Sequence, residues 1–438
     1  MRLPRGQHLA YCTNIHPAET WPETLAALEE HTLAVRARVC PKQPFGIGLR
    51  LSDQASRQLS QPRELASFRR WLERHDCYVF TINGFPFGRF HGGPVKERVY
   101  LPDWTSPERV EYTNRLFDLL AQLLPEGVAG SVSTLPGSFK EFITTPGQLA
   151  TIRGRLHDCV KHIAQVAARA RRDLSLGLEP EPLGLLETTR ETVEFFDRLR
   201  EEHPGDARLD EFLGVTYDTC HLAIEFEEPA QALALLQSHR VKISKIHLSN
   251  ALALRNGESG RAGPALTQRR DAAATLGGGL RMEELAPFAE DVYLHQVVAR
   301  AADGGLHRFR DLEVFLDSRS AIRDLQSSHG STECRPAVQG NPRSAIRNPQ
   351  SEMRQWEEAR VHFHIPLHTP PGGVLKSTSG HLLGVLDVLQ TNPGLCSHLE
   401  METYTWGVLP AALRSRSVAD QLAAEYNWCL GELRRRAA

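Results

Sequence analysis

Short apolar segments alternate with longer amphipathic segments along the first 250 residues. The apolar segments 8–14, 45–52, 77–84 and 129–135 have the length and side-chain content of strands. Three more strands are predicted within LSLGLEPEP, FLGVTYDTC and VKISKIHLSN. Between the strands, leucine and alanine recur at helical spacing over residues 21–39, 62–75, 106–124, 146–172, 188–203 and 230–238. This alternation predicts repeated right-handed βαβ units.

The number of units and the polar residues at the strand ends favour a closed (β/α)8 TIM barrel over an open doubly wound sheet. Nine segments compete for eight barrel positions, because both VHFHIPLH (361–368) and HLEMETYTWGVLP (398–410) have strand character. We assign 398–410 to the last barrel strand, between predicted helices at 381–389 and 419–436. Segment 361–368 is then expected to extend a loop above the barrel.

The last third of the chain is less regular. Residues 255–280 are polar and rich in glycine, which predicts a long loop of the kind that serves as a lid, and 282–301 predict a helical or mixed segment. Residues 317–352 are rich in Ser, Arg, Gln, Asn and Pro and contain the near-repeats RSAIRDLQS and RSAIRNPQS. We expect 317–352 to be a disordered insertion, and 1–316 with 353–438 to form one barrel domain.

Carboxylates and imidazoles stand where the last four barrel strands end. They are Glu179 and Glu181, Asp218 and His221, His247, and Glu400 and Glu402. Since the carboxyl ends of parallel barrel strands meet at one face, these groups are expected to converge. Mixed nitrogen and oxygen ligands suit zinc, manganese or magnesium in an open, catalytic or substrate-binding site. Glu181 alone is equally well explained as a solvated loop carboxylate, and His362, His364 and His368 as structural histidines.

Side chains expected at the mouth of the barrel are the predicted substrate-binding groups. They are His16, Arg50, Phe87, His91, Glu181, His364 and Trp406. The loop GFPFGRFHGG is dominated by aromatic residues and glycine. This composition indicates a substrate with more apolar surface than a simple sugar.

Charge and cysteine usage narrow the functional class. The formal charge of -2, from 51 basic and 53 acidic residues, gives no electrostatic reason to expect nucleic acid or an anionic membrane as the partner. The N-terminus has no apolar signal region and no run is long enough to span a bilayer, so a soluble cytoplasmic protein with a small-molecule substrate is expected. The eight cysteines form no CxxC pair, which argues against a thiolate zinc site and a disulfide framework.

Four segments, LGLEPEP, YDTCHLAIE, KIHLSN and LEMETYTW, resemble in this order the xylose isomerase-like barrel superfamily of sugar epimerases, isomerases and apurinic-site endonucleases. HLAYCTNIHPAETW, NGFPFGRFHG, VYLPDW and LEPEPLGLLETT are similar to segments of the EboE family, described as metabolite traffic proteins. The resemblance covers the chain except 317–352. It implies metal ligands at Glu179, Asp218, His247 and Glu402, with His221 next to substrate or metal. It also implies an operon whose other proteins move or mature a secondary-metabolite precursor.

Three functions follow as hypotheses. An isomerase or epimerase would use the ion to polarise a carbonyl and its adjacent hydroxyl, with Glu179 and Glu402 as acid and base and His221 as a further catalytic residue. A carrier would hold the precursor in the same cleft without turnover. Phosphodiester hydrolysis on DNA is the third, and the near-neutral charge disfavours it because DNA binding needs a basic face.

Overall fold

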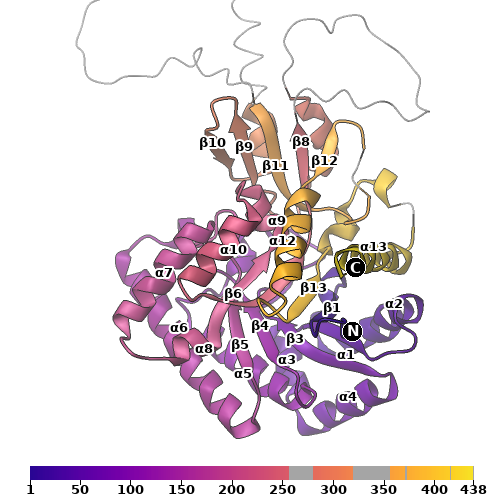
Figure 1. Cartoon of the computed structure of the whole chain (residues 1–438), viewed down its shortest axis with the longest axis vertical. Helices are drawn as coiled ribbons and strands as arrows, with labels where there is room; N and C mark the ends of the chain where they lie inside the picture. The colour runs from indigo at the N-terminus through magenta and orange to yellow at the C-terminus, as the bar shows by residue number, and fades with distance from the viewer. Residues whose placement is uncertain (256–279, 319–355, 370–371, 415, 438) are drawn as a thin grey trace, which may run out of the picture.

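Eight parallel strands close into a barrel in the computed structural model, which describes residues 1–255, 280–318, 356–369, 372–414 and 416–437 (Figure 1). Around the barrel the order is β1-β13-β7-β6-β5-β4-β3-β2. The strands are β1 (His8–Cys12), β2 (Phe45–Arg50), β3 (Cys77–Asn83), β4 (Gly130–Thr134), β5 (Leu174–Leu178), β6 (Leu213–Asp218), β7 (Lys242–Leu248) and β13 (His398–Met401). The predicted (β/α)8 barrel is confirmed.

Helices connect the barrel strands and surround them (Figure 1). They are α1 (Trp21–Ala27), η2 (Leu28–Thr32), α2 (Leu33–Val39), α3 (Asp53–Leu59), α4 (Pro62–Arg74), α5 (Pro107–Leu123), α6 (Pro146–Ala170), α7 (Thr189–Glu202), α8 (Arg208–Phe212), α9 (Thr219–Ile224), α10 (Pro229–Ser238), α12 (Ser379–Thr391) and α13 (Val418–Ala437). Short 3-10 turns are η1 (Thr13–Ile15), η3 (Lys96–Tyr100), η4 (Lys140–Phe142), η5 (Met282–Phe288), η8 (Tyr404–Val408) and η9 (Ala411–Leu413). Capping boxes at Thr20 with Glu23 and at Thr188 with Glu191 start α1 and α7.

A second, antiparallel sheet of five strands stands beyond one end of the barrel, in the order β10-β9-β11-β8-β12 (Figure 1). Its strands are β8 (Ala251–Arg255), β9 (Val297–Ala301), β10 (Leu306–Phe309), β11 (Trp356–His364) and β12 (Leu375–Ser377). The sheet has an apolar core of its own, which includes Leu252, Val297 and Phe363. Segment 361–368 therefore lies outside the barrel as expected, but the sheet to which it contributes was not predicted.

The whole second sheet is inserted between β7 and α12 in the chain. Residues 256–279 and 319–355, which contain most of the predicted lid loop and of the predicted low-complexity insertion, lie outside the described residues. Within the described ranges, no helix is long and apolar enough to cross a membrane.

The barrel interior mixes apolar layers with a buried polar layer. Strands β2, β3, β5 and β6 are buried along their whole length, as expected for parallel strands covered on both faces. Gly48 on β2 leaves the space that the Glu400 side chain fills, because a Cβ added at this glycine would lie 1.6 Å from Glu400 Oε1. Glu400 on β13 is paired in register with His247 on β7, which brings these two polar residues together inside the barrel.

Candidate metal centre

Three carboxylates surround one imidazole nitrogen at the carboxyl end of the barrel. Nδ1 of His247 lies 2.9 Å from Glu402 Oε2, 3.0 Å from Glu179 Oε1 and 3.4 Å from Asp218 Oδ2. All four residues are buried, and their ligand-type atoms lie within 4.8 Å of one another. The structure thus brings together the four side chains for which the sequence predicts metal binding.

Two of the carboxylates are oriented by hydrogen bonds to their outer oxygens. Asp218 caps α9, so its Oδ1 accepts from the backbone N–H of Cys220 at 2.7 Å, and it also accepts from Ser249 Oγ at 2.5 Å. Glu402 Oε1 accepts from Asn14 Nδ2 at 2.8 Å. In each case the other oxygen is left facing His247 Nδ1. Fixing the outer oxygen in this way is how proteins orient carboxylate ligands of a metal.

The far side of the imidazole is held by a buried ion pair. His247 Nε2 donates to Glu400 Oε2 at 3.1 Å, and Lys245 Nζ donates to the same oxygen at 2.6 Å. Both Lys245 and Glu400 have fully buried side chains. Burial favours a neutral carboxyl, but the Lys245 ammonium outweighs it and lowers the pKa of Glu400 to about 2. A charged carboxylate that accepts from Nε2 leaves Nδ1 as the nitrogen available to a metal.

The buried charges call for a cation at this point. Four carboxylates, those of Glu179, Asp218, Glu400 and Glu402, lie around the His247 ring, and the Lys245 ammonium contacts one of them. Glu179 Oε2 and Asp218 Oδ2 are buried and lack a hydrogen-bond partner among the described residues. Burial favours a neutral ring, but Glu402 and Glu179 outweigh it and raise the pKa of His247 well above its ordinary value.

A proton on His247 Nδ1 therefore stands where the oxygen atoms converge. Metal binding replaces such protons, because imidazole ligands must be unprotonated at the coordinating nitrogen. One nitrogen with three carboxylate oxygens suits a zinc, manganese or magnesium ion. The residues present fit the divalent ion that the sequence predicts.

A pocket with an empty volume of about 580 Å³ opens onto this cluster. Glu179 and Glu402 line it together with Glu181, His221 and His362. Aromatic and aliphatic side chains form its walls: Phe85, Phe90, Val95, Val99, Tyr100, Tyr293, Leu294 and Tyr404. The pocket therefore has a polar, acidic floor and largely apolar walls.

The two remaining polar residues predicted at these strand ends are Glu181 and His221. Burial, reinforced by the nearby Glu179 and Asp218 carboxylates, raises the pKa of Glu181 well above its ordinary value. Burial lowers the pKa of His221 to about 4. Its Nδ1 lies 3.1 Å from the carbonyl oxygen of Pro180, so Nδ1 carries the hydrogen and Nε2 carries the lone pair.

The predicted substrate-binding residues occupy different places. Glu181 lines the pocket, and His364 lies behind it, with Nδ1 3.1 Å from the backbone oxygen of Glu402. His91 supports the wall by bonding Tyr293 Oη at 2.7 Å and the carbonyl of Asn14 at 2.6 Å. The other four predicted residues are not among those that line the pocket. His16 stacks on His31, and Arg50 pairs with Glu19. Phe87 packs on Tyr112, and Trp406 packs against the core of the second sheet.

Several residues of the site were not predicted. Asn14 and Asn83 line the pocket, and the Nδ2 of each lies within 3.5 Å of Glu402 Oε1. Asn83 ends β3, so the rule that strand ends carry functional groups points to it. Lys245 has no comparable signal, because its inward direction depends on the barrel register.

No protein-family model and no curated protein matches this chain. The chain is similar to several solved structures, among which are sugar epimerases. It shares 17% identity with the 3-keto-D-glucoside 4-epimerase YcjR from E. coli, over 55% of this chain and 79% of that chain, with a TM-score of 0.33.

Two further similar structures carry other names. One is the probable 3-DHS dehydratase AsbF from Bacillus anthracis, with 14% identity over 56% of this chain and 73% of that chain, and a TM-score of 0.35. The other is an IOLI protein with a zinc atom, with 14% identity over 55% of this chain and 73% of that chain, and a TM-score of 0.35. The fold of the present chain rests on its own strand order and register, given above.

Proposed function

We propose that this protein is a divalent-metal-dependent isomerase or epimerase of a small hydroxylated metabolite, and that it is a xylose isomerase-like barrel of the EboE family. The observation that carries the proposal is the meeting of Glu179, Asp218, His247 and Glu402 in one buried group, of which Glu179 and Glu402 also line the pocket. Glu179, Asp218, His247 and Glu402 lie one each in the four segments on which the superfamily resemblance rests.

The chemistry divides between the ion and the protein. A divalent ion in this cluster would polarise a carbonyl and the hydroxyl next to it, which acidifies the C–H bond between them. Glu179 and Glu402 follow β5 and β13, and both line the pocket. One carboxylate would take the proton from carbon and the other, in its protonated form, would deliver a proton to the opposite face, which inverts the centre.

Two further groups of the pocket position the substrate. The raised pKa of Glu181 favours its protonated form, which would donate a hydrogen bond to a substrate oxygen instead of repelling the developing negative charge. His221 presents the lone pair of Nε2 and accepts from a substrate hydroxyl. The apolar walls fit a metabolite with more hydrocarbon surface than a simple sugar, as expected for the secondary-metabolite precursor implied by the EboE resemblance.

Exchange of a substrate C–H hydrogen tests the proposal directly. The metal-reconstituted protein is incubated in deuterated water with a panel of ketoses, aldoses and keto-sugars, and deuterium incorporation is followed by NMR. Glu179→Gln and Glu402→Gln should each abolish incorporation, whereas Glu126→Gln, at an exposed glutamate, should leave it unchanged. Incorporation that persists in both active-site variants would contradict the proposed roles.

A second candidate function is a carrier that holds the metabolite without converting it. The apolar walls around an acidic floor favour it, since they supply a binding cleft whether or not chemistry follows. Capture of a metabolite from lysate by the metal-loaded protein, with no deuterium incorporation into that metabolite, would establish the carrier and reject the isomerase.

A further inference from the structure

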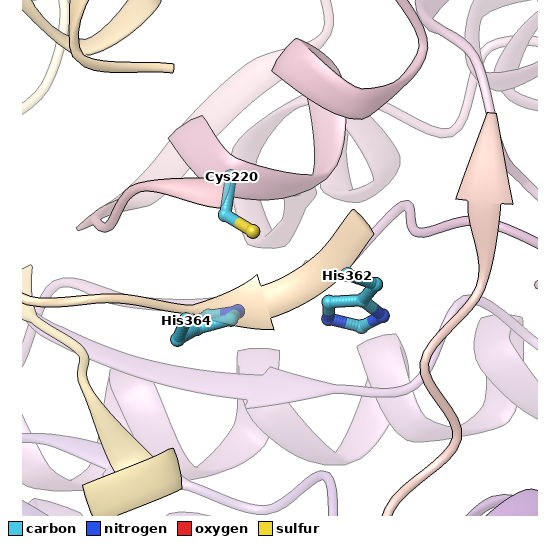
Figure 2. A group of neighbouring side chains, drawn as sticks. All are labelled: Cys220, His362 and His364. Atoms are coloured by element: carbon cyan, nitrogen blue, oxygen red, sulfur yellow. The ribbon is translucent and has the colours of Figure 1, made fainter. Parts of the chain in front are cut away.

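A second group of ligand-type side chains meets beside the first cluster. It consists of Cys220 on α9 and of His362 and His364 on β11 (Figure 2). All three are buried and offer ligand-type atoms within 4.8 Å of one another. The cysteine belongs to the barrel and the histidines to the inserted sheet, so this group joins the two parts of the fold.

Hydrogen bonds fix the ring nitrogens of both histidines. His362 Nδ1 lies 2.7 Å from Gln296 Oε1, and the amide of Gln296 is itself oriented because its Nε2 donates to the carbonyl of Pro182 at 2.9 Å. His364 Nδ1 lies 3.1 Å from the backbone oxygen of Glu402. Both acceptors are oxygens without hydrogen, so Nδ1 carries the hydrogen in each ring and Nε2 carries the lone pair.

The second ring nitrogen of each histidine, Nε2, is an acceptor that receives no hydrogen bond from the described residues. Each Nε2 is buried and without a hydrogen-bond partner in the described part of the chain. An unsatisfied buried acceptor costs about 1–3 kcal/mol, so two of them on histidines that group with Cys220 require an explanation. A histidine that donates Nδ1–H to an oxygen and presents Nε2 to a buried space has the arrangement of metal-ligating histidines.

We propose that Cys220, His362 and His364 bind a second divalent ion of the zinc type. One thiolate and two imidazoles form a softer ligand set than the oxygen-rich first cluster and therefore favour zinc over magnesium or manganese. Three protein ligands leave one position of a tetrahedral site open. His362 lines the pocket, so that open position is available to water or to a substrate oxygen.

Asp218 links the two sites. Besides the first cluster, it belongs to a group with His221 and His364 whose ligand-type atoms also lie within 4.8 Å of one another. Its Oδ2 is the atom left without a hydrogen bond, because Oδ1 is held by the start of α9 and by Ser249. Asp218 and His364 therefore place the proposed second site directly beside the first cluster.

A purely structural role accounts for part of the arrangement only. The Cys220 side chain packs with Ile224, Ala251 and Val298 in a small apolar cluster, as a buried thiol without metal would. That packing does not explain the two unpaired Nε2 atoms. The proposal concerns metal binding alone and holds whether or not the barrel isomerises a substrate.

Cobalt titration of the full-length protein tests the second site without an activity assay. After removal of metals with a chelator, Co²⁺ is added and the absorption spectrum is recorded. We expect a thiolate-to-cobalt charge-transfer band in the near ultraviolet, which Cys220→Ser should abolish while the weaker ligand-field bands of the first cluster persist. Cys12→Ser is the matched control, because Cys12 is also buried and its Sγ lies 3.9 Å from Glu402 Oε1.

Absence of the charge-transfer band in the unaltered protein, or its persistence in Cys220→Ser, would overturn the proposal. If Cys220→Ser does not fold, His364→Gln replaces it, with folding checked by circular dichroism. This variant keeps the thiol and should bind the thiolate-associated Co²⁺ at least about tenfold more weakly. A protein that keeps the band but catalyses no deuterium exchange would contradict the proposed function and leave the second site intact.

Discussion

The buried Lys245–Glu400 pair behind His247 gives a prediction with a defined magnitude. Glu400→Gln removes the charged partner of Lys245, whose ammonium donates to Glu400 Oε2 at 2.6 Å and to Ser133 Oγ at 3.1 Å. Both side chains of the pair are fully buried. Breaking such a pair by removing one partner costs about 3–5 kcal/mol, because the remaining charge cannot be hydrated. We expect a loss of this size in the free energy of unfolding, measured by urea denaturation of the metal-free protein.

Two variants serve as controls for the effect of losing one buried charge. Glu194→Gln removes one partner of the exposed Arg190–Glu194 pair, whose side chains are 83% and 65% exposed, and should cost less than about 1 kcal/mol. Lys245→Met combined with Glu400→Gln removes both charges and should recover stability relative to Glu400→Gln alone. If Glu400→Gln lowers the free energy of unfolding no more than Glu194→Gln does, the buried Lys245–Glu400 pair does not stabilise the protein as proposed.

The same substitution should also weaken metal binding. Glu400 accepts from His247 Nε2 and so orients the ring that faces the three carboxylates. Loss of a partner of this kind typically lowers metal affinity 10–100-fold, which is roughly 1.4–2.7 kcal/mol. Competition with a chromophoric zinc chelator measures the change, and an unaltered zinc affinity would show that Glu400 does not position the ligand.

Three further predictions concern other parts of the fold. Gly48→Ala should displace the Glu400 side chain and cost about 1–3 kcal/mol in unfolding free energy, whereas Gly154→Ala, with open space at its Cβ, should cost none. Burial raises the pKa of Glu425 from 4.5 to about 7. The unfolded state therefore loses this proton at a lower pH, so the free energy of unfolding should fall as the pH rises through that interval. Glu425→Gln should flatten this pH dependence, which is measured by thermal unfolding. Zinc should raise the melting temperature of the chelator-treated protein, and His247→Ala should reduce that increase; an equal increase in both would place the bound ion elsewhere.

The sequence was sufficient to predict the barrel and the meeting of four candidate ligand side chains, whose metal binding stays a prediction. Glu179, Asp218, His247 and Glu402 each follow or end an apolar segment of strand length, and parallel strands necessarily bring such positions to one face. The short helices α3, α8 and α9 were missed because one or two turns carry too little periodicity to detect. For α9, the deciding feature is the Asp218 side chain, which satisfies the backbone N–H groups at its start.

The features that the sequence did not yield depend on contacts between distant segments. Lys245 and Glu400 meet only because β13 pairs with β7 in a particular register. The second sheet escaped prediction because β8, β9, β10 and β12 have only 3–5 residues each and because long segments without a regular pattern separate β8 from β9 and β10 from β11. Arg50 is predicted to bind substrate from its place at a strand end, and the structure shows that its side chain pairs with Glu19. A strand-end position indicates where a side chain starts, but not which neighbour it reaches.

The place of β13 in the barrel has a consequence for biosynthesis. This strand sits between β7 and β1, so both of those strands keep an unpaired edge until the ribosome has delivered everything from Ser249 to Ser397. Unpaired parallel edges are templates for association with other chains. The barrel therefore cannot close before β13 has been synthesised, and Glu402, which follows β13, is the last of the four predicted ligands to be added to the chain.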